Sequence, residues 1–238
     1  MLIGVYETLR IVQLPSGLLR MLVYPLTFLF YYFFASKYYG EAFLYDLNLS
    51  LILGILLLAI ISITLFYFKD ELFTLSGKFC FSLLYPLLGF GYALGLIDFI
   101  SDSKISLEAF WLFVLIWSSD SFAYFSGRLF GKHKMAPTIS PKKTWEGFAG
   151  GVILTLLLSY FIHTKADTLN GNWMVVGLLV AIFAPLGDLV ESQLKRLFGV
   201  KDSGNIIPGH GGILDRLDSF IICAPVVYLY FIFDNLIN

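Results

Sequence analysis

The sequence predicts an all-α, polytopic membrane protein with about seven transmembrane helices and two long polar loops. Hydrophobic residues make up 58% of the 238 residues and charged residues only 14%, and the mean hydropathy is +0.81. This much apolar surface exceeds what one compact core can bury, so lipid must solvate most of it. The same composition argues against a disordered chain and against a nucleic-acid-binding protein.

Seven apolar stretches are long enough, or nearly so, to cross about 30 Å of hydrocarbon as helices. The first, fifth and last stretches are the shortest. Two of the segments between the stretches are long and rich in charge. The predicted spans are residues 21–36, 49–68, 79–97, 105–125, 147–162, 173–190 and 219–233.

The distribution of cations predicts the orientation of these spans. Most of the 16 Lys and Arg residues fall on alternate connections, including both long polar loops. By the positive-inside rule, those loops and the N-terminus face the cytoplasm, with the chain in the inner membrane. We expect a single integral membrane domain over residues 1–238, in which residues 1–104 supply N-terminal spans and residues 105–238 carry the motifs.

Two GxxxG pairs, Gly91/Gly95 and Gly147/Gly151, fall within predicted spans. Such pairs are typical of close helix contacts and of homodimers. Small residues scattered among 21 glycines would give the same pattern.

Placing an acidic residue at membrane depth costs about 2.5–3.5 kcal/mol of insertion free energy, so each one is expected to have a partner or a function. Asp120 falls near the cytoplasmic end of the fourth span, and Asp188 and Glu191 fall where the sixth span ends. If that helix continues, Asp188, Glu191, Ser192 and Lys195 share one face. Asp120 could instead pair with a neighbouring Lys or hydroxyl, and the other two acids could mark an ordinary helix end.

The loop at residues 192–219 combines cations, glycines and carboxylates. Asp215 and Asp218 share a helix face at the entrance to the last span. Carboxylates among cations suit Mg²⁺, which takes oxygen ligands and bridges phosphates, while glycines let backbone N–H groups approach phosphate oxygens. The pattern indicates phosphoryl or nucleotidyl transfer. Three cations, Lys195, Arg196 and Lys201, precede a glycine-rich turn that contains Gly209, Gly211 and Gly212.

The loop at residues 127–147 supports this interpretation with a cluster of hydroxyls and ammonium groups suited to phosphates, formed by Ser140, Lys142, Lys143 and Thr144. The loop could also serve only to set the topology. His210 is either a phosphate donor, an acid–base group or a turn residue. Walker A, HExxH and GxSxG motifs are absent from the sequence, which argues against a P-loop ATPase, a metalloprotease and a serine hydrolase.

Three segments resemble the phosphatidate cytidylyltransferases, also called CDP-diacylglycerol synthases. The longest reads S-x-LKR at residues 192–196, KD-x-G at 201–204 and IPGHGGI-x-DRLD at 207–218, and residues 120–134 and 140–147 resemble two further family segments. The resemblance implies a Mg²⁺-dependent membrane enzyme that condenses CTP with phosphatidic acid into CDP-diacylglycerol and pyrophosphate.

The resemblance also implies roles for individual residues. The catalytic residues would be Asp188, Asp215, Asp218, Lys201 and His210. Mg²⁺ would bind Asp188, Asp215 and Asp218, while Asp120 would orient a ligand or hold a second, monovalent cation. The substrate-binding residues would be Ser140, Lys142, Lys143, Thr144, Ser192, Lys195, Arg196, Asp202, Gly211, Gly212 and Arg216.

Three alternative functions share some of these features. A CTP-dependent lipid-alcohol kinase would release CDP instead of pyrophosphate. A CDP-alcohol phosphotransferase is disfavoured because its DGxxAR-type pattern is absent from the sequence. A cation transporter would explain Asp120 and Asp188 but would leave the glycine-rich basic loop unexplained.

Overall fold

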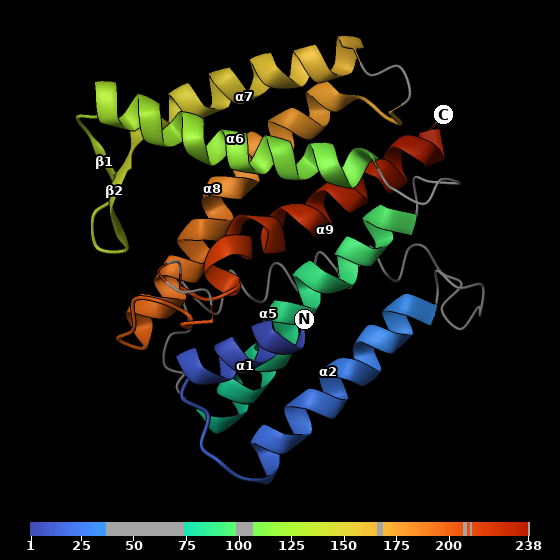
Figure 1. Cartoon of the computed structure of the whole chain (residues 1–238), viewed down its shortest axis with the longest axis vertical. Helices are drawn as coiled ribbons and strands as arrows, with labels where there is room; N and C mark the ends of the chain where they lie inside the picture. The colour runs from blue at the N-terminus through green and yellow to red at the C-terminus, as the bar shows by residue number, and fades with distance from the viewer. Residues whose placement is uncertain (37–73, 99–106, 166–168, 207–208, 210, 238) are drawn as a thin grey trace.

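The computed structural model describes residues 1–36, 74–98, 107–165, 169–206, 209 and 211–237. This part of the chain is mostly helical (Figure 1). The predicted span at 49–68 and the predicted site residue His210 lie outside the described residues. The helices are α1 (Leu2–Ile11), α2 (Leu18–Ser36), α5 (Leu75–Asp98), α6 (Leu107–Phe130), α7 (Trp145–Lys165), α8 (Trp173–Leu197) and α9 (Leu214–Ile237).

The helices confirm the predicted helical membrane protein in its coarse form. α7, α8 and the Leu214–Asp234 part of α9 are long and apolar enough to cross a membrane, by length and composition. α8 and α9 extend beyond the predicted spans into the polar loop. As a result, the acids around residues 188–191 and 215–218 are helical and have fixed positions relative to one another. The number of spans and their orientation stay predictions.

Two elements were not predicted. The short helix α1 precedes the first predicted span, and the charged loop before α7 contains an antiparallel hairpin of β1 (Lys134–Ala136) and β2 (Ser140–Thr144). The all-α prediction therefore misses this small sheet, because a short polar hairpin carries no alternation of apolar residues. Thr144 Oγ1 accepts a hydrogen bond of 3.1 Å from the Gly147 amide, so β2 leads directly into a capped helix.

Glycines bring the helix backbones close together. A Cβ added to Gly151 would lie 3.0 Å from the Ala123 Cβ, and one on Gly147 would lie 2.8 Å from the Ala123 carbonyl oxygen. This GxxxG pair therefore packs α7 against α6 within the chain. The homodimer stays a prediction.

α9 packs between α5 and α8 (Figure 1). A Cβ on Gly89 of α5 would lie 2.7 Å from the Ile221 Cα, and one on Gly187 of α8 would lie 2.7 Å from the Asp218 carbonyl oxygen. Only glycine permits so close an approach of two backbones. The first turns of α9 are thereby held against both neighbouring helices.

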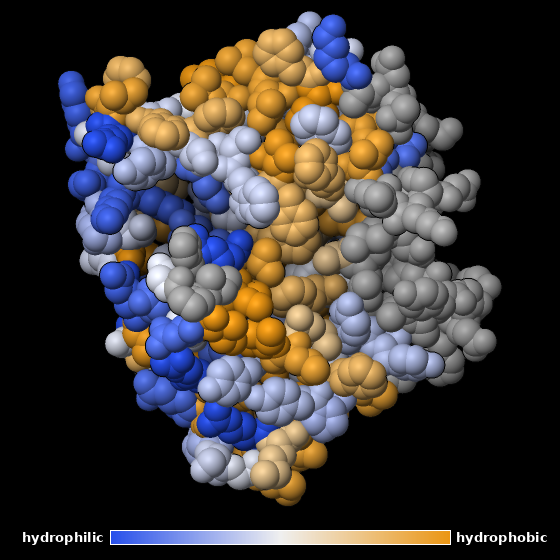
Figure 2. Space-filling model, in the orientation of Figure 1, coloured by the Kyte–Doolittle hydropathy of each residue, from blue (hydrophilic) through white to orange (hydrophobic). Residues whose placement is uncertain are grey.

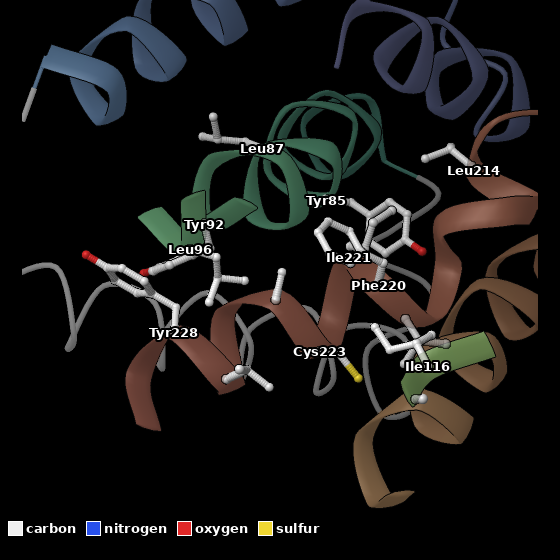
Figure 3. Close-up of a cluster of buried hydrophobic side chains, with 14 of the residues drawn as sticks. Tyr85, Leu87, Tyr92, Leu96, Ile116, Leu214, Phe220, Ile221, Cys223 and Tyr228 are labelled. Atoms are coloured by element: carbon white, nitrogen blue, oxygen red, sulfur yellow. The ribbon is translucent and has the colours of Figure 1, made fainter. Parts of the chain in front are cut away.

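The outer helix faces expose large apolar side chains, including Trp117, Ile153 and Phe161. Patches of this kind fit contact with lipid. Figure 2 shows hydrophilic residues gathered along the edge that carries the hairpin and the α8–α9 loop. The buried hydrophobic cluster around α5 and α9 is shown in Figure 3.

Candidate active site

Three acids from three helices approach one another at the hydrophilic edge. We call Asp120 of α6, Asp188 of α8, Asp218 of α9 and the accompanying Lys143 of β2 the carboxylate cluster. The three carboxylates are close enough to repel one another electrostatically. Since they come from segments up to 98 residues apart in sequence, the fold, and not local sequence, brings them together.

Lys143 is the counter-charge of this cluster. Its Nζ lies 2.9 Å from Asp188 Oδ2 and donates to the Pro185 carbonyl oxygen, also at 2.9 Å. Ser192 Oγ donates to Asp188 Oδ1 at 3.0 Å. The Asp188 side chain remains 34% exposed, so a solute can reach it. Lys143 acts on Asp188 and Asp120, while Lys195 acts on Asp218. Lys195 is also bound by Glu191 and Asp215, so negative charge remains in excess.

A second group of polar side chains lies beside this cluster, around the first turn of α9. We call Glu191, Lys195, Asp215, Ser203 and Glu7 the buried network. Lys195 Nζ lies 2.6 Å from Asp215 Oδ1 and 3.1 Å from Glu191 Oε1. Asp215 Oδ2 accepts from the Ser203 amide and hydroxyl, each at 2.9 Å. Both oxygens of Asp215 are therefore engaged.

Glu7 joins the N-terminal helix to the start of α9. Its carboxylate accepts hydrogen bonds from the Ile213 amide at 2.9 Å, the Leu214 amide at 2.8 Å and the Ser203 hydroxyl at 3.1 Å. A helix N-terminus presents unpaired N–H groups and favours negative charge, so Glu7 stabilises α9 where the acids begin. The side chain is fully buried.

Sequence reasoning missed Glu7. The one available signal was a charged residue among the apolar positions of a short helix, since Val5, Leu9 and Ile11 are also buried. A carboxylate on a buried face requires partners. Those partners are about 200 residues away in sequence, and no local pattern identifies them.

The predicted glycine-rich turn packs around carboxylates in this structure. Gly212 donates its amide to Asp215 Oδ2 at 2.8 Å. Gly211 has a φ of +82°, and a Cβ there would lie 2.5 Å from the same oxygen. A Cβ on Gly204 would lie 2.7 Å from Glu7 Oε1. Glycine at these positions therefore lets the loop close over the buried network.

The other predicted site residues on the hairpin and on α8 lie around these two groups. Ser140 and the exposed Lys142 are on β2, while the buried Thr144 caps α7. Arg196 donates from Nε to the Ile139 carbonyl oxygen and from Nη1 to that of Val200, each at 3.3 Å. Arg196 thus connects the hairpin turn to the α8–α9 loop.

Three of the predicted residues after α8, Lys201, Asp202 and Arg216, are exposed. Lys201 and Asp202 line a pocket of about 260 Å³ together with Arg10 of α1, and Arg216 is exposed on α9. Gly211 and Gly212 belong to the turn described above. The structure therefore brings together Asp120, Lys143, Asp188, Ser192 and Asp218 as one group, and Lys195 and Asp215 as another.

The donor chemistry of the carboxylate cluster fits a hard divalent cation. Its ligands are oxygens, which Mg²⁺ prefers, and their excess negative charge would be offset by such an ion. Among the described residues, no group of three or more His, Cys, Asp or Glu side chains has the spacing of a metal site. Any ion would therefore require these side chains to move closer together.

The chain is similar to known proteins over almost its whole length. The model of a family described as the cytidylyltransferase family matches residues 1–233. A protein of Haemophilus influenzae named phosphatidate cytidylyltransferase is 39% identical over 251 aligned residues, which cover 97% of this chain and 86% of the relative.

Two further relatives carry the same name. One from Staphylococcus saprophyticus is 41% identical over 167 residues, covering 69% of this chain and 62% of the relative. One from Bacillus subtilis is 51% identical over 121 residues, covering 50% of this chain and 45% of the relative. The similarity thus extends over the whole chain in one relative and over part of the chain in the others.

Proposed function

This chain belongs to the cytidylyltransferase family, and we propose that it condenses CTP with phosphatidic acid to give CDP-diacylglycerol and pyrophosphate. The membership predicted from the signature residues is confirmed by the match over residues 1–233. The apolar helices make it a membrane protein. Relatives in bacteria support a place in the inner membrane. From the distribution of Lys and Arg along the sequence, we propose that the N-terminus and the active site lie on the cytoplasmic side.

The carboxylate cluster is the observation that carries this proposal. It combines acids, which can hold a cation, with Lys143, which can exchange Asp188 for a phosphate oxygen. A triphosphate brings its own negative charge to a site that already has an excess. Nucleotide binding there therefore needs a cation beside it.

The reaction requires charge neutralisation more than a strong base. A phosphatidate oxygen is anionic near neutral pH, so it can attack the α-phosphorus of CTP directly. The new bond joins that oxygen to the α-phosphorus, and the bond from the α-phosphorus to the bridging oxygen breaks. Pyrophosphate then leaves with the electron pair. Lys143 and the nearby Lys142 would bind the charged phosphate oxygens during transfer.

Asp120, Asp188 and Asp218 would hold Mg²⁺, which would supply positive charge that lowers the repulsion between the phosphate groups. Asp215 would join these ligands only by giving up one of its present bonds to Lys195, Ser203 or Gly212. A second, monovalent cation beside Asp120 would also lower the repulsion between the phosphate groups. The acyl chains would stay in the bilayer while the head group reaches the hydrophilic edge.

Product identity tests the function. Purified protein in detergent receives CTP, phosphatidic acid and Mg²⁺, and we expect pyrophosphate and a CDP-lipid in equal amounts. A chelator such as EDTA should stop the reaction. No CDP-lipid would contradict the proposal. CDP and a phosphorylated lipid formed when diacylglycerol replaces phosphatidic acid would favour the kinase alternative, and ion flux in liposomes would favour the transporter.

A further inference from the structure

Tyr85 of α5 lies outside the segments that carry the family signature, yet it reaches the site. Its side chain is fully buried and its ring stacks on Phe81, with 5.2 Å between ring centroids. Figure 3 shows the ring beside Phe220 and Ile221, with the hydroxyl directed toward the start of α9. Gly89, one turn later on the same face, allows the close approach of α5 to α9.

The Tyr85 hydroxyl has no hydrogen-bond partner among the described residues. A buried donor without an acceptor costs free energy, and native proteins rarely keep one without a use. Four carboxylates are close enough to interact electrostatically with this hydroxyl: those of Glu191, Asp218, Asp188 and Asp215. The hydroxyl is thus a free donor facing the acids of the site.

Glu191 of α8 presents the complementary feature. Its side chain is fully buried, and neither carboxylate oxygen has a hydrogen-bond partner in the described part of the chain. Its one charged contact there is Lys195, at 3.1 Å. The buried side-chain atoms that lack partners in the described residues are these two oxygens, the Tyr85 hydroxyl and the Thr155 hydroxyl. Since Oε1 faces Lys195, Oε2 is the acceptor of Glu191 that lacks a partner among the described residues, and the Tyr85 hydroxyl is a donor without one in the same part of the core.

Lys195 links this pair to the nucleotide chemistry. Its ammonium lies between two carboxylates, those of Glu191 and Asp215, so its charge is already matched. A hydrogen bond to Glu191 from another donor would weaken the hold of Glu191 on Lys195. Lys195 would keep its bond to Asp215, and the N–H group released from Glu191 would be available to bind a phosphate oxygen.

We propose that Tyr85 is a positioning residue that donates its hydroxyl to Glu191 in the nucleotide-bound state and so releases Lys195 toward the phosphates of CTP. The proposal rests on the proposed function and adds to it a residue from the N-terminal half of the chain. Forming this bond requires a change of side-chain conformation relative to the present structure.

The test is Tyr85→Phe, which removes one oxygen and no packing. We expect the KM for CTP to rise at least about tenfold, as for loss of one hydrogen bond to a charged group, with kcat and the KM for phosphatidic acid changed less than about twofold. The thermal midpoint without ligands should be unchanged or higher, because an unpaired buried hydroxyl is removed. A lower midpoint would show a structural partner for the hydroxyl and overturn the proposal.

Tyr92→Phe is the matched control. Tyr92 lies two turns further along the same face of α5, is also buried, and contacts Tyr228 at the far end of α9 (Figure 3). The same substitution there should leave the KM for CTP unchanged. An equal rise in both variants would mean that any lost hydroxyl on α5 perturbs the site, which contradicts a specific role for Tyr85.

A double-mutant cycle with Glu191→Gln tests the coupling. If Tyr85 acts through Glu191, the two effects on CTP affinity are non-additive, and additive effects overturn the proposal. CTP affinity is measured by calorimetry as well as by turnover, so the result does not depend on the lipid product. Failure of the wild-type protein to form CDP-lipid would refute the proposed function alone, whereas unchanged CTP binding in Tyr85→Phe would refute the role of Tyr85 alone.

Discussion

Asp215 and Asp218 stand one turn apart on the same helix, and their surroundings differ sharply. Asp215 receives hydrogen bonds from Lys195, Gly212 and both donor groups of Ser203. Asp218 accepts from the Ser219 amide at 2.6 Å and is repelled by Asp188 and Asp120. One carboxylate is fully bonded within the protein, whereas the other lies among like charges.

Within one signature segment, Asp215 therefore stabilises the fold, while Asp218 is available to a ligand. A carboxylate with all its oxygens bonded stabilises the fold but has little capacity left for a ligand. A carboxylate among like charges costs stability, and a cationic ligand is what removes that cost. We therefore expect a substitution at Asp218 to lower turnover more than stability, and a substitution at Asp215 to lower stability more than turnover.

Asp218→Asn should have the largest effect on turnover. Loss of one charge from the carboxylate cluster should lower kcat by about a thousandfold, as for loss of a group that stabilises transition-state charge. The thermal midpoint should stay the same or rise, because repulsion by Asp120 and Asp188 is relieved. Turnover assays and thermal unfolding in detergent check both effects, and near-normal turnover would remove Asp218 from the site.

Asp215→Asn should instead lower stability. Lys195 and Asp215 have side chains only 11% exposed, and breaking such a buried pair costs about 3 kcal/mol. The unfolding free energy measured by denaturant titration should fall by this amount. Asp202→Asn, at an exposed acid nearby, is the control and should leave stability unchanged. If Asp215→Asn unfolds like the wild type, the two aspartates do not differ as described.

Glu7→Gln tests whether the buried network begins in α1. The amide keeps one acceptor oxygen but places an NH₂ group toward the Leu214 or Ile213 amide, so about 1–2 kcal/mol of unfolding free energy should be lost. Turnover should fall moderately, because α9 is held less firmly. Unchanged stability would indicate that α1 does not support the start of α9.

Ser203→Ala should have the smallest effect, about 1 kcal/mol of unfolding free energy, because one hydroxyl is lost while its backbone amide still binds Asp215. Combined with Glu7→Gln, the loss should be less than additive, since the Ser203 hydroxyl bonds both carboxylates. Fully additive losses would argue against a connected network.

Much of the part at residues 105–238 was predictable because its signals are local. Apolar length located α7, α8 and α9, and acids at helix spacing placed Asp188 with Ser192 and Asp215 with Asp218. The sequence predicts Asp188, Asp215 and Asp218 around one ion, with Asp120 orienting a ligand or holding a second cation; in the structure Asp120 lies with Asp188 and Asp218. Lys143 was predicted near phosphates, and it pairs with Asp188 in this structure.

The missed features depend on contacts between distant segments. Glu7 and Tyr85 precede the signature and look like ordinary residues of apolar helices until α9 is packed against α1 and α5. The hairpin escaped prediction because its strands are short and polar. The glycines were expected to face phosphate, but Gly211 and Gly212 fold the turn around Asp215, a role that spacing alone does not distinguish.

Direct binding of a divalent ion tests the central claim, which is that Asp120, Asp188 and Asp218 form the site where CTP is bound and activated. Mn²⁺ replaces Mg²⁺ and is titrated into wild-type and Asp218→Asn protein, each with CTP, while electron paramagnetic resonance reports the free ion. We expect saturable binding to the wild type and affinity at least about tenfold weaker in the variant. Equal Mn²⁺ affinity in the two proteins would contradict the account.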